Sequence, residues 1–128
     1  MEIIGNGVDI IKNSRIKKLI KNPKFISRIF SKNEINDSKK IKNKTNFFAK
    51  RFAAKEAFVK AIGIGLRKGI NFNDIYIKNN KLGKPTISFN KNVKKILNKK
   101  FKSGRFNVYV SLSDEKQYSI AYVIINKL

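Results

Sequence analysis

Two acidic residues stand in apolar surroundings in a chain of 128 residues that contains only 8 acids. Asp9 lies inside the run GVDII, and Glu56 lies inside RFAAKEAFVKA, between small or aromatic side chains. A buried carboxylate needs a partner, because an unpaired charge is expensive to take out of water. Lys60 follows Glu56 by four residues, which places both side chains on one face of a helix. Two carboxylates beside lysines could hold a hard cation such as Mg²⁺ together with the phosphates of a substrate.

Each acid also has a simpler interpretation that the sequence leaves open. Asp9 could cap the turn or helix that follows its strand. Glu56 and Lys60 could form an exposed ion pair of the kind that contributes little to stability. Two rare acids in apolar settings, both near lysines, favour the interpretation with metal and phosphate.

The composition excludes several kinds of chemistry. The chain has no Cys and no His, which rules out disulfides, thiolate nucleophiles, Cys-ligated zinc and a histidine proton shuttle. Carboxylates, lysines, hydroxyls, backbone dipoles and a hard metal ion remain. The lack of Cys fits a reducing cytoplasmic setting. No apolar run approaches the ~18 residues of a transmembrane helix, and the N-terminus shows no signal-peptide pattern, so we expect a cytoplasmic protein.

The formal net charge is +22, from 30 Lys and Arg against 8 Asp and Glu. Such a field attracts polyanions, which include nucleic acids, phosphate cofactors, acidic proteins and anionic membranes. Heavy use of Lys and Asn, as in proteins encoded by AT-rich DNA, explains the charge equally well. The charge alone therefore does not choose a partner.

The spacing of apolar residues predicts an α+β fold in a single domain over 1–128, with helices in the first half and a mostly antiparallel sheet. The clearest element is a helix at 46–62, where apolar residues recur at the helical period and Gly63 provides a stop. The other expected elements are a strand at 2–11, a helix at 13–23 capped by Ser14 and stopped by Pro23, helical turns at 25–30, a capping box from Ser31 to Glu34, a loop or frayed helix at 37–44, strands in DIYIK and PTISF joined by a hairpin, a basic helix in NVKKILNKKF, and strands in RFNVYVSLS and YSIAYVII.

The segments GNGVDIIKNSRI, RFAAKEAFVKAIGIG, LGKP and VSLS, in this order, resemble the holo-[acyl-carrier-protein] synthases, the small trimeric members of the 4′-phosphopantetheinyl transferase superfamily. The resemblance runs from about residue 4 to 125. It implies that this chain moves the phosphopantetheine arm of coenzyme A onto a serine of apo acyl-carrier protein, in support of fatty acid biosynthesis. It also implies Mg²⁺ dependence, release of adenosine 3′,5′-bisphosphate and a homotrimer with active sites between subunits.

The same resemblance assigns roles to individual residues. Asp9 and Glu56 would bind Mg²⁺, with Glu56 and Lys60 as the catalytic residues. Further contacts to coenzyme A would come from Arg51, Lys55, Lys60, Gly63, Gly65, Lys84, Pro85 and Tyr109, and docking of the acidic carrier protein from Arg15, Lys18 and Arg28. Plainer roles stay open for three of them: a solvated helix residue for Arg51, a helix C-cap for Gly63 and a turn residue for Pro85.

Tyr109 marks a departure from the family pattern. Many members have a His at this place, two residues before the Ser of V-S-x-S, where it reaches the phosphates. A phenol can donate a hydrogen bond to a phosphate, but it is a poor base at neutral pH. The serine proton would therefore pass to Glu56 or to water on the metal, which we state as a hypothesis.

Two other kinds of protein compete with the transferase interpretation. A nucleic-acid-binding module would explain the charge, but its bases should form a patch or stripe, whereas here they occur in every segment. No helix-turn-helix, RRM or KH signature is visible. A catalytically dead homologue is disfavoured by the intact set of Asp9, Glu56 and Lys60. We expect no nucleic-acid or membrane partner.

Overall fold

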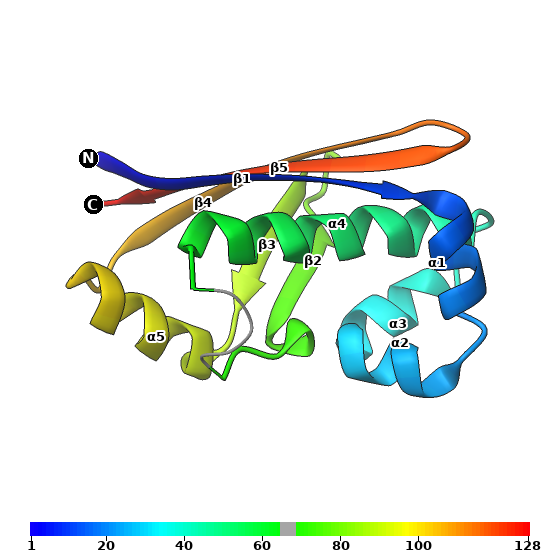
Figure 1. The fold of residues 1–128 in the computed structure, drawn as a ribbon, viewed down its shortest axis with the longest axis horizontal. Coiled ribbons are helices and arrows are strands. Elements are labelled where there is room, and N and C mark those ends of the chain that lie inside the picture. Colours follow the sequence, from blue (N-terminus) through cyan, green and yellow to red (C-terminus); the bar gives the residue numbers. More distant parts are fainter. Residues whose placement is uncertain (65–68) are drawn as a thin grey trace.

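The computed structural model describes residues 1–64 and 69–128. In these ranges the chain forms a three-stranded antiparallel sheet, a two-stranded hairpin and a set of helices beneath the sheet (Figure 1). The elements in chain order are β1 (Glu2–Lys12), α1 (Asn13–Leu19), α2 (Pro23–Ile29), α3 (Lys32–Ser38), α4 (Lys44–Ile62), the 3-10 turn η2 (Phe72–Asp74), β2 (Ile75–Asn79), β3 (Pro85–Phe89), α5 (Lys91–Phe101), β4 (Phe106–Asp114) and β5 (Tyr118–Lys127).

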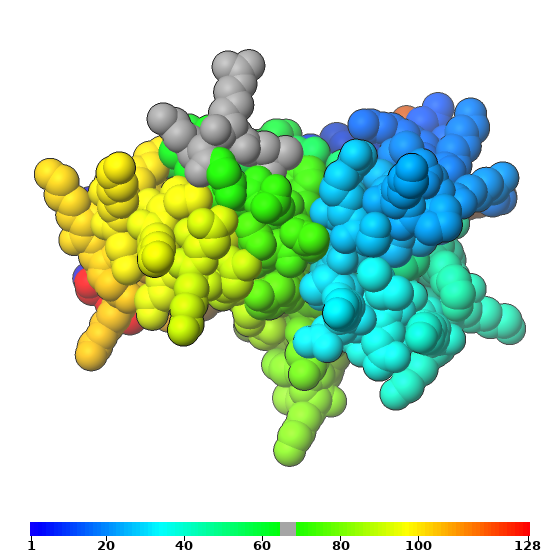
Figure 2. Space-filling model, turned by 90° about the horizontal axis from the view of Figure 1, so that it is seen from below, coloured from blue at the N-terminus to red at the C-terminus, as the bar shows by residue number. Residues whose placement is uncertain are grey.

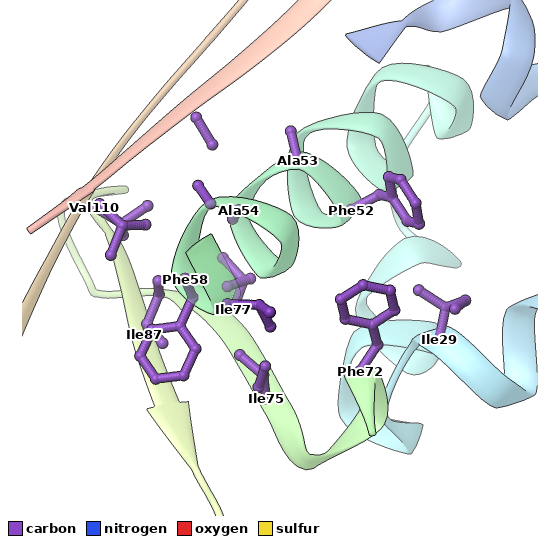
Figure 3. Packing of buried hydrophobic residues seen from close by; sticks show 14 of the residues in the cluster. Ile29, Phe52, Ala53, Ala54, Phe58, Phe72, Ile75, Ile77, Ile87 and Val110 are labelled. Carbon is purple, nitrogen blue, oxygen red and sulfur yellow. The ribbon is translucent and has the colours of Figure 1, made fainter. Parts of the chain in front are cut away.

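Helix α4 is the centre of the packing. It lies between the sheet of β1, β5 and β4 on one side and α2, α3, β2 and β3 on the other (Figure 1). Its alanines allow close approach to the sheet, and its aromatic side chains fill the space towards η2 and the hairpin (Figure 3). Gly63 ends the helix in the left-handed conformation, with φ of 81°, which glycine adopts without strain. The predicted helix and its stop are confirmed.

The two faces of the larger sheet have different surroundings. Strand β5 lies in the middle, paired antiparallel with β1 and β4. Ala121, Val123 and Ile125 point from it towards α4 and are fully buried. The alternate residues point to the other face, which no described helix covers (Figure 1). On that face Val8 stands opposite Tyr122 and Ile10 opposite Ile120. A sheet normally puts polar residues on a solvated face, so this apolar face needs a further explanation.

The helices α1, α2 and α3 form one end of the molecule and α5 the other. Seen from the side opposite the sheet, they appear in blue to cyan and in yellow, with the green hairpin and the end of α4 between them (Figure 2). None of the helices in the described ranges is long and apolar enough to cross a membrane. Helix α1 contacts both β1 and α4, so these three elements meet at the end of the sheet where β1 leads into α1.

The α+β prediction is confirmed, and the differences from it are local. Helix α1 begins at Asn13 directly after β1, so Ser14 is inside the helix and not its N-cap. Pro23 occupies the first turn of α2, which Asn22 caps, because proline is well suited to a first helical turn. The predicted capping box between Ser31 and Glu34 is present at the start of α3.

Candidate active site

Two glycines in β1 bring this strand against the backbone of α4. A Cβ atom at Gly7 would lie 2.0 Å from the carbonyl oxygen of Ala57, and one at Gly5 would lie 2.0 Å from that of Ala61. Any other residue at either position would collide with the helix backbone. The glycines therefore set how closely β1, with Asp9, approaches α4, with Glu56 and Lys60.

Asp9 and Lys60 form an ion pair across this contact. Asp9 belongs to the same strand face as Gly7 and Ile11, which points towards α4. Lys60 Nζ donates to Asp9 Oδ1 at 3.0 Å and to the carbonyl oxygen of Val8 at 3.1 Å. The Lys60 side chain is 54% exposed and that of Asp9 17%. The lysine can thus leave for another anion without leaving a buried amine behind.

Glu56 lies half-buried within electrostatic reach of this pair. Burial raises the pKa of the Glu56 carboxyl above its ordinary value, and the negative charge of Asp9 raises it further. The positive charges of Lys60 and Arg15 act in the opposite direction. Strand β1, helix α1 and helix α4 therefore bring two carboxylates and two cations together, as the sequence predicted for three of these four residues.

The donor set fits a hard divalent cation. Asp9 and Glu56 offer only carboxylate oxygens, which Mg²⁺ prefers. Within residues 1–64 and 69–128, no third Asp, Glu, His or Cys completes a metal cluster with them. A site with two carboxylates suits a cation that takes its remaining ligands from water and substrate phosphates. The raised pKa of Glu56 fits as well, because a cation beside the two acids would relieve their repulsion.

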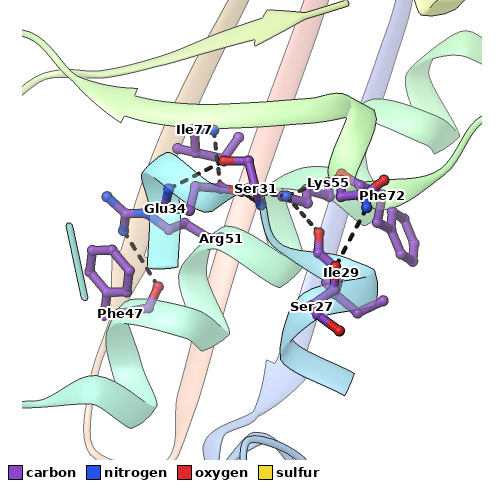
Figure 4. A network of polar contacts seen from close by, with 10 residues as sticks. Ser27, Ile29, Ser31, Glu34, Phe47, Arg51, Lys55, Phe72 and Ile77 are labelled. Carbon is purple, nitrogen blue, oxygen red and sulfur yellow. Dashed lines mark hydrogen bonds and ion pairs between the residues drawn. The ribbon is translucent and has the colours of Figure 1, made fainter. Parts of the chain in front are cut away.

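Lys55 does not join this site, which corrects the expected phosphate contact. Its side chain is fully buried on the other side of α4. Its Nζ atom donates to Glu34 Oε1 at 2.6 Å and to the carbonyl oxygens of Ile29 at 2.8 Å and Phe72 at 3.1 Å (Figure 4). These bonds occupy all three donors of the ammonium group, so none is free for a phosphate.

Arg51 is also placed away from the carboxylate pair. Its guanidinium carbon lies 3.6 Å from the centre of the Phe47 ring, and Nη1 donates to the Phe47 carbonyl oxygen at 3.4 Å. Burial lowers the pKa of Arg51, and the charges of Glu34 and Asp37 oppose that shift. Arg51 is 4% exposed. It is therefore not the solvated helix residue that the sequence left open, and its contact to coenzyme A stays a prediction of the family resemblance.

The remaining predicted contacts to coenzyme A are spread over other elements. Gly63 caps α4, and a Cβ atom there would meet Lys100 Nζ at 3.1 Å. Lys84 lies exposed in the turn between β2 and β3, and Pro85 opens β3. Neither has a hydrogen bond or ion pair to Asp9, Glu56 or Lys60. Gly65 lies outside the described residues.

Tyr109 lies on the opposite face of the sheet from Asp9. It alternates with Val110, which points towards α4 and is buried, and its own side chain is 49% exposed. Its strand β4 is separated from β1 by β5. Within one chain, Tyr109 and the carboxylate pair therefore do not meet.

The three predicted docking residues lie on the short helices next to the site. Arg15 and Lys18 are exposed on α1, and Arg28 is exposed in the last turn of α2. Arg15 is the one whose charge acts on Glu56. The surface around the carboxylate pair is therefore basic on the side of α1.

Sequence reasoning missed two sets of residues. It quoted the segment that contains Gly5 and Gly7, but did not recognise that these glycines carry the contact with α4. It found Glu34 through its capping-box spacing, but not that the same carboxylate binds Lys55. The pattern G-x-G-x-D could have indicated the role of the glycines. The contact between Glu34 and Lys55 could not be predicted without knowing that α3 packs against α4.

Comparisons with known proteins agree over almost the full chain. The 4′-phosphopantetheinyl transferase superfamily matches residues 5–123. The holo-[acyl-carrier-protein] synthase of Pelagibacter ubique is 56% identical over 127 residues, which cover 99% of each chain. The crystal structure of this synthase from Neisseria meningitidis has a TM-score of 0.87 at 37% identity and covers 98% of this chain and 99% of its own.

A third relative is a Bacillus anthracis holo-(acyl-carrier-protein) synthase, solved in complex with CoA (3′,5′-ADP). It has a TM-score of 0.83 at 35% identity, with 100% of both chains covered. Such matches over whole chains are decisive for the family. The chain belongs to the 4′-phosphopantetheinyl transferase superfamily and, within it, to the holo-[acyl-carrier-protein] synthases, and it is a phosphopantetheinyl transferase.

Proposed function

We propose that this enzyme transfers the 4′-phosphopantetheine arm of coenzyme A to a serine hydroxyl of apo acyl-carrier protein and releases adenosine 3′,5′-bisphosphate. The observation that carries the proposal is the meeting of Asp9, Glu56 and Lys60 where β1 crosses α4. The relatives' names and the coenzyme A complex from Bacillus anthracis support the two substrates. We place the reaction in fatty acid biosynthesis and, since the chain has no cysteine, in the reducing cytoplasm.

The carboxylate pair would hold Mg²⁺, which would neutralise the charge of the pyrophosphate of coenzyme A. Catalysis of phosphoryl transfer consists mostly of positioning and charge stabilisation. Lys60 is suited to the same task, because its exposed amine can turn from Asp9 Oδ1 to a phosphate oxygen. As a point charge it would stabilise the leaving adenosine bisphosphate.

Glu56 is the group on this chain that is best suited to accept the serine proton. The chain has no His, and Tyr109 lies on the far face of the sheet. Burial and the charge of Asp9 raise the pKa of the metal-free Glu56 carboxyl above its ordinary value, and a positioned carboxylate can act as a general base. A Glu56 carboxylate oxygen would take the proton from the serine hydroxyl while the serine oxygen attacks the phosphorus atom.

The outer face of the sheet supports a homotrimer. Val8, Ile10, Tyr109, Ile120 and Tyr122 form an apolar face with exposures between 38% and 61%. Contiguous apolar surface on a folded chain marks an interface. The family resemblance supplies the stoichiometry of three. By the same resemblance the active sites lie between subunits, where the Tyr109 hydroxyl of one copy could donate to a phosphate at the site of another.

Carrier-protein docking would use the basic surface of α1 and α2. Arg15, Lys18 and Arg28 are exposed there, and acyl-carrier proteins are acidic, so the potentials are complementary. Arg15 is next to the carboxylate pair, which suits delivery of the acceptor serine. We expect its charge to act mainly on the carrier protein and less on coenzyme A.

Intact mass spectrometry of an apo acyl-carrier protein tests the reaction. The carrier protein is incubated with this enzyme, coenzyme A and Mg²⁺, and a parallel sample contains EDTA. A mass gain of one phosphopantetheine arm that EDTA abolishes is the expected result. A folded enzyme that modifies none of several carrier proteins would refute the proposal, and a gain that survives EDTA would refute the metal site alone.

A further inference from the structure

Helix α4 carries a second charged group directly beside Glu56, and it points about 100° away around the helix axis. Lys55 and Glu34 form an ion pair whose side chains are 0% and 1% exposed. Figure 4 shows this pair among α2, α3, α4 and the start of β2. Buried ion pairs of this kind are uncommon, because the loss of hydration offsets the attraction between the charges.

Every polar atom of the pair is used inside the protein. Lys55 Nζ donates to Glu34 and to the carbonyl oxygens of Ile29 and Phe72. Glu34 Oε1 also accepts from the backbone N–H of Ser31 at 2.9 Å, and Oε2 accepts from that of Ile77 at 3.1 Å. The two side chains therefore join five segments: the end of α2, the start of α3, α4, η2 and β2.

Stability alone is a weak reason for such a pair. Neutral side chains of similar size usually replace a buried ion pair without loss, whereas removal of one partner is strongly destabilising. Its better-attested use is to select one packing arrangement among several. Here the arrangement concerns the orientation of α4 about its axis, because Lys55 and Glu56 are neighbours in the helix and turn together.

The opposite side of α4 is held by a different device. Gly5 and Gly7 let β1 lie against the carbonyl oxygens of Ala61 and Ala57, which sets the distance between helix and strand. That contact is between backbones and contains no directional side-chain hydrogen bond. The polar bonds of Lys55 on the other side are directional, so the two together define one position for the helix.

We propose that the Glu34–Lys55 pair is a positioning device for the reaction: it fixes the orientation of Glu56 relative to α2, which carries the docking residue Arg28. The inference rests on the proposed function, because it concerns the geometry between the carboxylate pair and the bound carrier protein. Lys55 and Glu34 touch neither substrate in this account. They act through α4 and α2.

The decisive variant removes both charges at once. In E34Q/K55M a neutral amide faces a thioether, so no unpaired charge is buried. We expect a lower melting temperature than that of the wild type, because the Ile29 carbonyl oxygen and the backbone N–H of either Ser31 or Ile77 lose their partners, so the kinetics are measured below it. We also expect kcat to fall about 10- to 100-fold, because small misplacements of catalytic groups have effects of this size. KM for either substrate should change less than kcat, since each binding surface keeps its residues.

A matched control is available on the same helix. Lys50 of α4 pairs with Asp114 of β4 at 3.5 Å, with both side chains 30% exposed. The variant D114N/K50M makes the same chemical changes in a pair at the surface. Its kcat should equal that of the wild type. The comparison separates the loss of a buried pair from the loss of a lysine in α4.

Position is measured directly by spin labels. The chain has no cysteine, so Cys introduced at Lys24 of α2 and Lys44 of α4 would carry the only labels. Labelled chains are diluted into unlabelled protein, so that each oligomer holds one labelled copy. We expect one narrow distance distribution for the wild type and a broader or shifted one for E34Q/K55M.

The two readouts decide the matter together. A folded double variant with lower kcat and a changed distance distribution supports the proposal. A double variant with the kcat and distances of the wild type overturns it. If the wild type itself modifies no carrier protein, the proposed function fails, and the distances alone then decide whether the pair positions the helix. If the double variant does not fold, the variant E34D, which keeps both charges and shortens one side chain by a methylene, is measured below its melting temperature by the same criteria.

Discussion

Lys60 of the long helix and Asp9 of the first strand, 51 positions apart in the chain, share an ion pair of 3.0 Å. We propose Asp9 as a metal ligand and Lys60 as a phosphate contact. In the free enzyme the ion pair holds these two side chains together. Both groups are thus in place before substrate arrives. An exposed lysine can change partners easily, because an exposed ion pair contributes little to stability.

Replacement of Lys60 by Met should impair catalysis far more than stability. We expect kcat/KM for coenzyme A to fall about 100-fold, the usual effect of removing one group that stabilises developing charge. The free energy of unfolding should change by less than about 1 kcal/mol. Steady-state kinetics and urea unfolding measure both. K50M, a lysine of the same helix paired at the surface, should keep full activity, and equal loss in both variants would contradict the role of Lys60.

Replacement of Glu56 by Gln should abolish turnover and stabilise the metal-free protein at neutral pH. Because burial and Asp9 raise the folded-state pKa of Glu56, the folded chain binds more protons there than the unfolded chain. The stability from this group is fully present below the unfolded pKa and is lost as pH rises through the raised pKa. E56Q does not titrate and escapes this loss.

Thermal unfolding of E56Q and wild type from acidic to neutral pH in EDTA measures the effect. The melting temperature of E56Q relative to wild type should rise with pH. A difference that falls as pH rises would mean that the pKa of Glu56 is not raised.

Replacement of Gly7 by Ala should separate β1 from α4. The new methyl group would lie 2.0 Å from the Ala57 carbonyl oxygen, so the strand must shift and Asp9 with it. We expect a loss of about 1–3 kcal/mol in unfolding free energy, as for other overpacked sites, and a weaker affinity for Mg²⁺. G104A has no atom within 4 Å of its Cβ and should be neutral in urea unfolding. Two equally stable variants would show that the contact between strand and helix is not tight.

Reversal of Arg15 to Glu should act on the carrier protein. We expect KM for the acyl-carrier protein to rise much more than KM for coenzyme A, because an acidic partner is repelled. Steady-state titrations of each substrate separate the two, and R105E, at an exposed arginine after α5, serves as the matched control. Equal rises in both KM values for R15E would indicate a folding defect instead of a docking role.

Insertion of a charge into the outer sheet face should break the oligomer. I10E places a carboxylate in the apolar face, where Ile10 stands opposite Ile120, and burial of this charge between copies would be unfavourable. Size-exclusion chromatography with light scattering should give a trimer for the wild type and a monomer for I10E. L82E, at a fully exposed leucine in the hairpin turn, should remain a trimer. If the wild type is a monomer, the proposed homotrimer is wrong.

Much of the fold was predictable because the signals are local. Apolar periodicity identified α4 and the strands, Gly63 marked the end of α4, and the Ser31–Glu34 spacing marked the start of α3. The errors also had local causes. Ser14 is a good N-cap by type, but α1 continues directly from β1 and leaves no capping position for it.

The candidate site also has a part that the sequence predicts and a part that it does not. The sequence by itself determined the acids, the lysine at the right helical spacing and the glycines that precede Asp9, since residue types and short separations are all that these need. It did not determine which side of α4 meets Asp9 of β1. Lys55 and Glu56 are adjacent and both flanked by apolar residues, and helix geometry only says that they point about 100° apart.

Only the tertiary structure decided between them. Segments distant in the chain, β1 on one side and α3 with β2 on the other, surround α4 and assign each charge its partner. Burial and pairing of a charge depend on all the groups packed around it. The local sequence of a helix therefore shows that it bears charges, and the packing of the whole chain decides which charge lies beside Asp9 and which is buried against Glu34.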